Sequence, residues 1–150
     1  MTKVFVYSGL PGSGKSSLIR ERHPDAFVFS ADDFFMVDGE YVFDPAKIGM
    51  AHADCFRRFI ECLKMGVIVS SDSDVLVVDN TNTTSVEISP YMLAADAFGA
   101  ESEVVTVKCD PMVAHARNTH GVPKEAQEAL AAQLDKRELM PWWPNSEIQN

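Results

Sequence analysis

Residues 9–16 read GLPGSGKS and match the pattern Gly-x-x-x-x-Gly-Lys-Ser at every fixed position. The apolar run 4–7 comes directly before this segment, and residues suited to a helix follow it. Glycines at these positions let successive backbone N–H groups converge on one point, so that they form a concave anion-binding nest at a helix N-terminus. The segment therefore predicts a loop that binds nucleotide phosphate between a buried strand and a helix.

Two side chains of this loop have the chemistry for phosphoryl transfer. Lys15 is expected to reach the β- and γ-phosphates, where a flexible point charge can follow the group being transferred. The Ser16 hydroxyl is placed to ligate Mg²⁺, which makes ATP with Mg²⁺ the expected cofactor pair. The residues of this loop expected to contact the nucleotide are Gly12, Ser13, Gly14, Lys15, Ser16 and Ser17.

Length, charge and cysteine content narrow the class of protein. With 150 residues, of which 46% are hydrophobic, the chain is expected to form a single domain over 1–150. The net charge of −9 argues against sequence-independent binding along a nucleic-acid backbone, but a local pocket can still grip one terminus or a small phosphorylated molecule. The three cysteines have no Cys-x-x-Cys spacing, which indicates neither a disulfide framework nor a zinc site.

Targeting signals and partners can also be judged from the sequence. No apolar stretch approaches the length of a membrane span, and the first residues lead into a strand instead of a secretory signal. We therefore expect a cytoplasmic protein that binds a small-molecule nucleotide, with a nucleic-acid 5′ end as a candidate second partner and no membrane partner. The oligomeric state is left open.

Four short apolar runs have the composition of buried parallel strands, and none of them alternates cleanly with polar residues. They are 4–7, 27–29, 75–78 and 104–107. Helices are expected at 15–22, 45–64, 85–97, 111–117 and 123–139. The alternation predicts an α/β sandwich, followed by a C-terminal tail, 140–150, whose Trp142 and Trp143 are expected to pack against the domain or a partner.

The helix over 45–64 carries three candidate substrate contacts. One stripe at steps of three or four is expected to face inward, and it consists of Ile48, His52, Cys55, Phe59 and Cys62. His52 on this stripe is either a hydrogen-bonded core histidine or a substrate contact. Arg57 and Arg58 fall elsewhere, as solvated charges or as groups that reach an anionic substrate at the helix edge.

Acidic residues follow two of the predicted strands. Asp79 ends the run 75–78, where the second half of a P-loop site places the acid that organises the metal beside Ser16. The next residues offer amides at the carboxyl edge of the sheet, so Asn80 and Asn82 are substrate candidates, although this segment can instead only cap a helix.

The acid pair Asp32-Asp33 follows the run 27–29 and should emerge at the same edge. A carboxylate there can accept the proton of an attacking hydroxyl. Asp32 is the first choice as this base and Asp33 the second; a turn or helix cap is the alternative. Arg117 lies just after the fourth strand and is the best-placed cation for the far side of the γ-phosphate, on a segment, 117–123, that could act as a mobile lid.

These motifs together resemble the P-loop kinases similar to bacteriophage polynucleotide 5′-hydroxyl kinase and their small stand-alone relatives. The resemblance rests on 9–16, on 30–35 (SADDFF), on 78–82 (VDNTN), and on Arg117-Asn118 with 121–123 (GVP). It implies a three-layer P-loop kinase fold with a short, mostly parallel sheet, strand order 2-3-1-4 and helices on both faces. It also implies that Asp32 is the general base and Arg117 the lid arginine.

One position departs from the pattern of that family. The resemblance implies a substrate-phosphate-binding arginine three residues after the base, where this chain has Phe35. That departure weakens the case for a 3′-phosphorylated nucleotide and leaves Arg57, Arg58 or His52 as replacements. The segment 38–45 is expected to form a small hairpin beside the acceptor pocket, with Asp38-Gly39 as its turn.

The resulting hypothesis is an ATP-dependent kinase that transfers the γ-phosphoryl group to a hydroxyl, with a polynucleotide or nucleotide-like 5′-hydroxyl as the leading acceptor. A small-metabolite kinase acting on a sugar, a nucleoside or a cell-wall precursor is the alternative. A second alternative, from another class, is an ATP-binding switch or interaction module without an acceptor. Asp32-Asp33 argues against the switch, because water activation has less need of a separate acceptor pocket.

Overall fold

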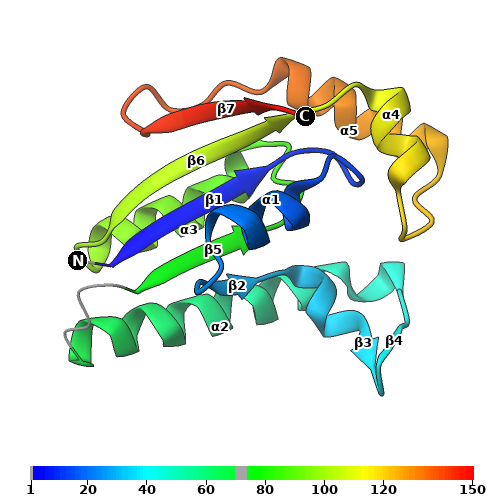
Figure 1. Ribbon diagram of the computed structural model, residues 1–150. Helices are drawn as coiled ribbons and strands as arrows, with labels where there is room; N and C mark the ends of the chain where they lie inside the picture. The colour runs from blue at the N-terminus through cyan, green and yellow to red at the C-terminus, as the bar shows by residue number, and fades with distance from the viewer. Residues whose placement is uncertain (1, 70–73) are drawn as a thin grey trace.

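The computed structural model describes residues 2–69 and 74–150, and in this part of the chain five parallel strands form one sheet (Figure 1). The strands are β1 (Lys3–Ser8), β2 (Phe27–Phe29), β5 (Val75–Asp79), β6 (Glu101–Lys108) and β7 (Asn145–Gln149). The helices are α1 (Lys15–Arg22), α2 (Ile48–Val69), α3 (Ser85–Ala97), α4 (Pro111–Arg117) and α5 (Lys124–Lys136). The sheet order β2-β5-β1-β6-β7 confirms the predicted order of the first four strands.

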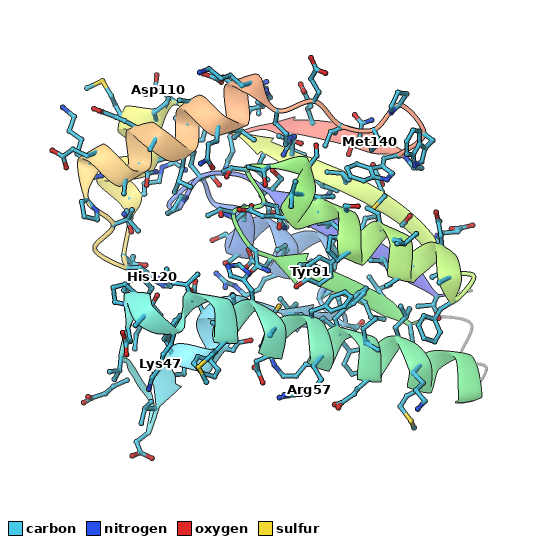
Figure 2. All side chains as sticks on the ribbon, turned by 180° about the vertical axis from the view of Figure 1, so that it is seen from behind. Lys47, Arg57, Tyr91, Asp110, His120 and Met140 are labelled. Carbon is cyan, nitrogen blue, oxygen red and sulfur yellow. The ribbon has the colours of Figure 1, made fainter. Side chains whose placement is uncertain are left out.

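Side chains of the central strand β1 alternate between the two faces of the sheet. Val4 and Val6 belong to the core that residues of α2 and α3 complete, whereas Tyr7 packs with Ile19 of α1 in a second cluster. Figure 2, seen from behind, shows α2 and α3 together on one side of the sheet. Helices on both faces give the three-layer α/β architecture that the sequence predicts.

Strand β2 is a correction to the expectation that each predicted strand is covered on both faces. Phe27 is 52% exposed and Val28 is 43% exposed. The reason is position, because β2 lies at the edge of the sheet and pairs only with β5. Composition alone does not distinguish an edge strand from a central one.

The helix predicted over 45–64 is longer than expected, and only part of its predicted inward stripe is buried. A 3₁₀ turn, η2 (Pro45–Lys47), precedes α2, which continues to Val69. The buried stripe runs through Ala51, Cys55, Phe59 and Leu63. Ile48 and His52 of the predicted stripe are exposed instead, because the first turns of α2 extend beyond the sheet, as Figure 1 shows. The last predicted helix also ends early, at Lys136 in place of residue 139.

The C-terminal tail forms a fifth strand that the sequence did not predict. Strand β7 pairs in parallel with β6, and its sequence, NSEIQ, is too polar to read as a strand without that partner. Trp143 is buried at 7% exposure, whereas Trp142 is 70% exposed. Trp143 therefore packs on the domain, whereas Trp142 does not, and packing of Trp142 on a partner stays a prediction.

A hairpin with the predicted turn is present, but it spans 36–41 in place of 38–45, and it follows a 3₁₀-helix, η1 (Ala31–Phe35). Its strands are β3 (Met36–Val37) and β4 (Glu40–Tyr41). Asp38 and Gly39 between them have φ values of 50° and 83°, as the predicted two-residue turn requires. Among the helices of residues 2–69 and 74–150, none has the length and apolar character to cross a membrane.

Candidate functional site

The phosphate loop has the backbone conformation that its glycines predict. Gly12 and Gly14 have φ values of 80° and 91°, in the left-handed region. Gly12 also packs closely on α4, because a Cβ there would lie 2.0 Å from the carbonyl oxygen of Ala114. Two amides from distant segments hold loop carbonyls: Gln127 Nε2 donates to Pro11 O and Asn150 Nδ2 to Ser13 O, both at 2.7 Å.

Lys15 is buried at the start of α1, at 8% exposure. Its Nζ donates to Gly9 O at 2.9 Å and to Leu10 O at 3.0 Å. Burial lowers the pKa of Lys15 from its usual value, while the carboxylates of Asp79 and Asp32 act in the opposite direction. The ammonium group thus lies between the loop and two acids, where a phosphate can replace its carbonyl partners.

Ser16 and Asp79 lie together, as the two halves of a P-loop site require. Ser16 Oγ donates to Asp79 Oδ2 at 2.7 Å, which joins the first turn of α1 to the end of β5. Hydroxyl and carboxylate oxygens are the donors that Mg²⁺ prefers, and nucleotide phosphates normally supply part of its coordination. The described residues contain no cluster of three or more His, Cys, Asp or Glu that could hold a metal alone. The pair therefore fits a phosphate-bound Mg²⁺.

Asp32 lies across the cleft from the loop, on η1, and both of its carboxylate oxygens have partners. Tyr41 OH donates to Asp32 Oδ1 at 3.1 Å, and His120 Nδ1 lies 3.4 Å from Asp32 Oδ2. Burial, together with the charge of Asp32 and its hydrogen bond, raises the pKa of Tyr41 to about 12. The phenol therefore stays protonated near neutral pH and remains a donor to this carboxylate.

The two arginines of α2 pair with acidic residues and do not line the cleft. Arg58 donates to Asp54 and to Ser30 O, both at 2.9 Å, and lies 3.5 Å from Asp33. Arg57 pairs with Asp54 and is largely exposed. Neither side chain lines the cleft, whereas His52 and Asp33 do.

Of the remaining candidate substrate contacts, some support neighbouring strands and segments, and others line the cleft. Asn80 Oδ1 accepts from Ala31 N at 2.8 Å, which anchors η1 to the end of β5. Asn82 is 2% exposed and donates to Tyr7 O at 2.8 Å, so it braces β1 and does not line the cleft. Phe35, also buried, packs edge-on against Tyr41 and forms part of the cleft wall.

Arg117 ends α4 and is exposed. Its Nη1 lies 3.8 Å from the position that a Cβ on Gly14 would take, which places the guanidinium beside the phosphate loop. Arg117 does not line the cleft itself, but the segment 118–123 that follows it does.

These elements enclose a cleft of about 1290 Å³. The phosphate loop and the start of α1 form one side, η1 with the hairpin and the first turns of α2 form the other, and residues 118–123 reach across. In Figure 2, His120 lies at the tip of that segment, next to the N-terminal end of α2. A nucleotide on the loop and an acceptor beside Asp32 can therefore occupy one continuous space.

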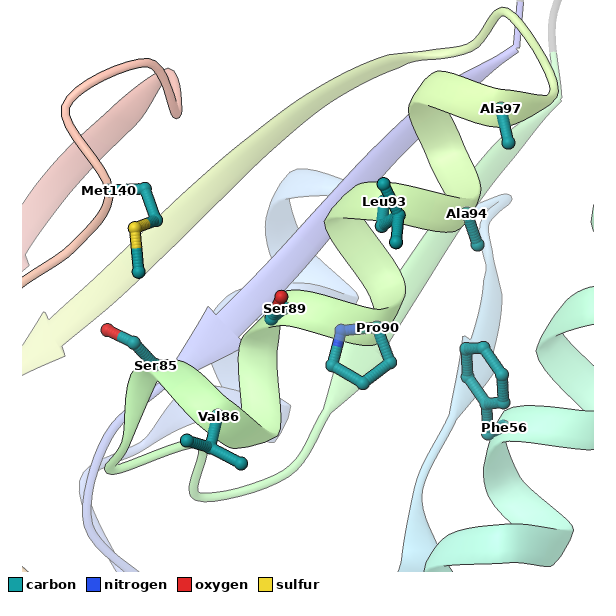
Figure 3. Close-up of a pocket in the computed structure, with 9 residues that line it drawn as sticks. All are labelled: Phe56, Ser85, Val86, Ser89, Pro90, Leu93, Ala94, Ala97 and Met140. Atoms are coloured by element: carbon teal, nitrogen blue, oxygen red, sulfur yellow. The ribbon is translucent and has the colours of Figure 1, made fainter.

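A second hollow of about 580 Å³ lies between α2, α3 and the loop that holds Met140 (Figure 3). Its lining is almost entirely apolar and includes Phe56, Val86 and Leu93, with no ionisable group. It offers no chemistry for phosphate or metal, so the candidate site is the larger cleft.

Sequence reasoning missed three residues that the fold brings to the site or beneath it. The sequence placed Tyr41 in the predicted hairpin and His120 in the predicted lid without a role for either side chain. In the structure, both contact Asp32. Arg137 donates to Thr106 Oγ1 at 2.7 Å, to Asn82 O at 3.1 Å and to Ser8 Oγ, and its burial lowers its pKa. The three contacts of Arg137 span 31 to 129 residues, and no local pattern predicts them.

The sequence profile of the AAA domain family matches residues 4–140, and the chain belongs to this family of P-loop domains. A curated human protein, NEDD4-binding protein 2 of Homo sapiens, is 33% identical over 124 residues. That match covers 78% of this chain and 7% of the human protein, so the chain corresponds to a small part of its relative.

Solved structures share the fold. A chain in the structure of the Pnkp1/Rnl/Hen1 RNA repair complex matches with a TM-score of 0.68 and 19% identity, over 89% of this chain and 44% of that one. A sugar kinase from Janibacter sp. HTCC2649 matches with a TM-score of 0.61 and 14% identity, over 99% of this chain and 86% of that one. The chain therefore has the fold of P-loop kinases, and its family makes the loop a nucleotide-binding loop.

Proposed function

We propose that this protein is a Mg²⁺- and ATP-dependent kinase that transfers the γ-phosphoryl group to a polynucleotide or nucleotide-like 5′-hydroxyl. Residues 1–150 would act as one kinase domain, with 117–123 as its lid. The observation that carries the proposal is that Asp32 faces the same cleft as Lys15 and the Ser16–Asp79 pair. Asp32 lies on η1, on the opposite side of the cleft from the phosphate loop. This position leaves room for an acceptor molecule between the acid and the phosphates, which activation of water alone would not require.

The transfer needs each group in a defined role. As the acceptor oxygen forms a bond to the γ-phosphorus, its proton passes to Asp32 Oδ2, and the bond from phosphorus to the bridging oxygen breaks to leave ADP. Lys15 and the loop N–H groups hold the phosphates, and Arg117 beside Gly14 is close enough to swing toward the charge that develops. Mg²⁺, held by Ser16 and Asp79, would neutralise charge on the phosphate oxygens.

Asp32→Asn is the direct test. The amide cannot accept the acceptor's proton but keeps the size of the side chain, so transfer should fall by about 100-fold or more. ATP affinity, measured by calorimetry, should stay within about threefold, because Asp32 does not belong to the phosphate loop. Asp33→Asn is the matched control, since Asp33 already pairs with Arg58. Equal losses in the two variants would contradict the assignment of the base.

A small-metabolite kinase is the second candidate, and one observation favours it. Neither Arg57 nor Arg58 lines the cleft, so neither contributes a phosphate-binding cation on the acceptor wall. An assay with labelled ATP that offers an oligonucleotide with a free 5′-hydroxyl beside a panel of sugars and nucleosides separates the two. Label on a sugar and none on the oligonucleotide would replace our acceptor. ATP hydrolysis without transfer to any acceptor would favour a nucleotide switch.

A further inference from the structure

The acceptor wall contains a feature that neither catalysis nor phosphate binding uses. The imidazole ring of His120 lies on the ring of Tyr41, with centroids 4.5 Å apart and planes inclined by 38°. The same imidazole directs Nδ1 to within 3.4 Å of Asp32 Oδ2. The imidazole of His120 thus covers one face of the Tyr41 ring, and its Nδ1 lies close to Asp32, the candidate base.

The wall behind this ring is aromatic. Phe43 lies nearly parallel to Tyr41, with ring planes inclined by 12° and centroids 6.3 Å apart, and Phe35 meets both rings edge-on. Phe43 is 50% exposed, so part of its surface is free for contact. Arg57 and Arg58 do not line the cleft. Such a wall suits an uncharged flat group better than a phosphate or a polar sugar.

An acceptor needs the two places that His120 fills. Its hydroxyl must reach Asp32, and Oδ2 is the oxygen that does not hold the hydrogen bond of Tyr41. At a centroid separation of 4.5 Å, no second ring fits between His120 and Tyr41. We propose that the acceptor's terminal nucleobase packs on Tyr41 beside Asp32, in the place now held by His120, so that His120 and the acceptor compete for one site. This inference rests on the proposed function, because it takes Asp32 as the base.

Two consequences follow from this arrangement. Stacking on an aromatic face tolerates every base, so the site would select for the presence of a nucleobase and not for its identity. Tyr41 becomes a specificity-determining residue. His120 becomes a latch at the tip of segment 118–123 that must leave Tyr41 before an acceptor enters, which reduces apparent acceptor affinity.

The test compares two oligonucleotides that both carry a free 5′-hydroxyl. One has a normal nucleotide at its 5′ end, and the other has an abasic residue with the same sugar hydroxyl. Transfer from γ-labelled ATP should have a kcat/KM about 5- to 150-fold higher for the normal end, the fold-change that stacking of one base supplies. Equal kcat/KM values would overturn the inference and leave the proposed kinase intact. No transfer to either oligonucleotide would overturn the proposed function together with the inference.

Two variants distinguish the contribution of the aromatic ring of Tyr41 from that of its hydroxyl group. Tyr41→Phe keeps the aromatic face and should retain the preference for the normal end, although kcat falls with the loss of the bond to Asp32. Tyr41→Leu removes the face and should reduce the preference to about twofold or less. Thermal unfolding checks that both variants fold, and the comparison of the two oligonucleotides on the unaltered protein needs neither of them.

The competition between His120 and the acceptor is tested by the KM for the oligonucleotide. His120→Ala should lower KM for the normal oligonucleotide by about threefold or more, because the occupied place becomes free. The KM for ATP should change less than the KM for the oligonucleotide, since the imidazole of His120 contacts Asp32 and Tyr41. A higher acceptor KM in this variant would show that His120 binds the acceptor, and would overturn the competition.

Discussion

Gly12 has two separate reasons to be glycine. Its φ of 80° lies in the left-handed region, and a Cβ would meet the carbonyl oxygen of Ala114 at 2.0 Å. Gly39 in the hairpin turn has a similar φ of 83° but nothing within 4 Å of such a Cβ. Comparing substitutions at the two glycines therefore distinguishes the cost of backbone strain from the cost of a steric clash.

Alanine substitutions at these glycines should have unequal costs. Gly39→Ala should lower the free energy of unfolding by about 1–2 kcal/mol, the cost of a left-handed residue with a Cβ. Gly12→Ala should cost clearly more, because the loop must also move away from α4, and it should weaken nucleotide binding. Urea unfolding and calorimetry with ATP check both. Equal destabilisation would mean that the contact with Ala114 relaxes freely.

Asn80 shows how a residue's role depends on its partners. From the sequence, it is an amide at the ligand-binding edge of a sheet. In the structure, its Oδ1 accepts from Ala31 N, so that it fixes the segment that carries Asp32. Asn80 therefore positions the acid pair from behind, in addition to lining the cleft.

At the scale of elements, β7 depends on its neighbours for its existence. Its burial alternates between exposed and half-buried residues, and it pairs only with β6. Trp143 packs in the core just before it, and Pro144 O accepts from Val104 N at 2.9 Å. At the far end, Asn150 N donates to Lys108 O, and its side chain holds Ser13 O of the phosphate loop.

The paired tryptophans test this anchoring. Trp143→Ala should lower the free energy of unfolding by about 3–5 kcal/mol, as expected for a large aromatic removed from a core. Trp142→Ala should change it by no more than about 0.5 kcal/mol, because that side chain is 70% exposed. Chemical unfolding of both variants supplies the measurement. A large loss from Trp142→Ala would indicate a packing role that its exposure does not suggest.

At the scale of the whole molecule, all three tyrosines of the chain titrate abnormally. Burial raises the pKa of Tyr7, Tyr41 and Tyr91 above the usual 10.0, in the case of Tyr41 to about 12. A folded pKa above the unfolded value means that the folded state holds these protons more tightly. Their contribution to stability is therefore complete below about pH 10 and is lost as pH rises toward the folded pKa.

The expected outcome is a joint transition in alkali. Phenolate absorbance should stay low until pH exceeds the usual tyrosine pKa, and should then rise together with loss of secondary structure measured by circular dichroism. Tyr41→Phe should remove part of the absorbance change. A half-maximal phenolate signal at about pH 10 in a protein that is still folded would contradict the burial of these groups.

Much of the fold could be predicted because its signals are local. Residues 9–16 predict a loop between a strand and a helix, and apolar runs identify four of the five strands of the sheet, whose order follows from the family resemblance. The motifs also predict that Ser16 and Asp79 lie side by side, and Ser16 Oγ lies 2.7 Å from Asp79 Oδ2. Spacing and periodicity suffice here, because loop geometry and the apolar character of a strand are properties of residues that are neighbours in the sequence.

Other features depend on segments that meet only in the folded chain. Asp32, Tyr41 and His120 belong to three elements, and their contact needs the hairpin and segment 118–123 to reach the same end of the cleft. Strand β7 and the pairing of Arg137 likewise arise from partners far away in sequence. The amino-acid order thus decides that phosphate is held and where acids emerge. Tertiary packing decides which partners each acid takes, because those contacts join residues with no shared local pattern.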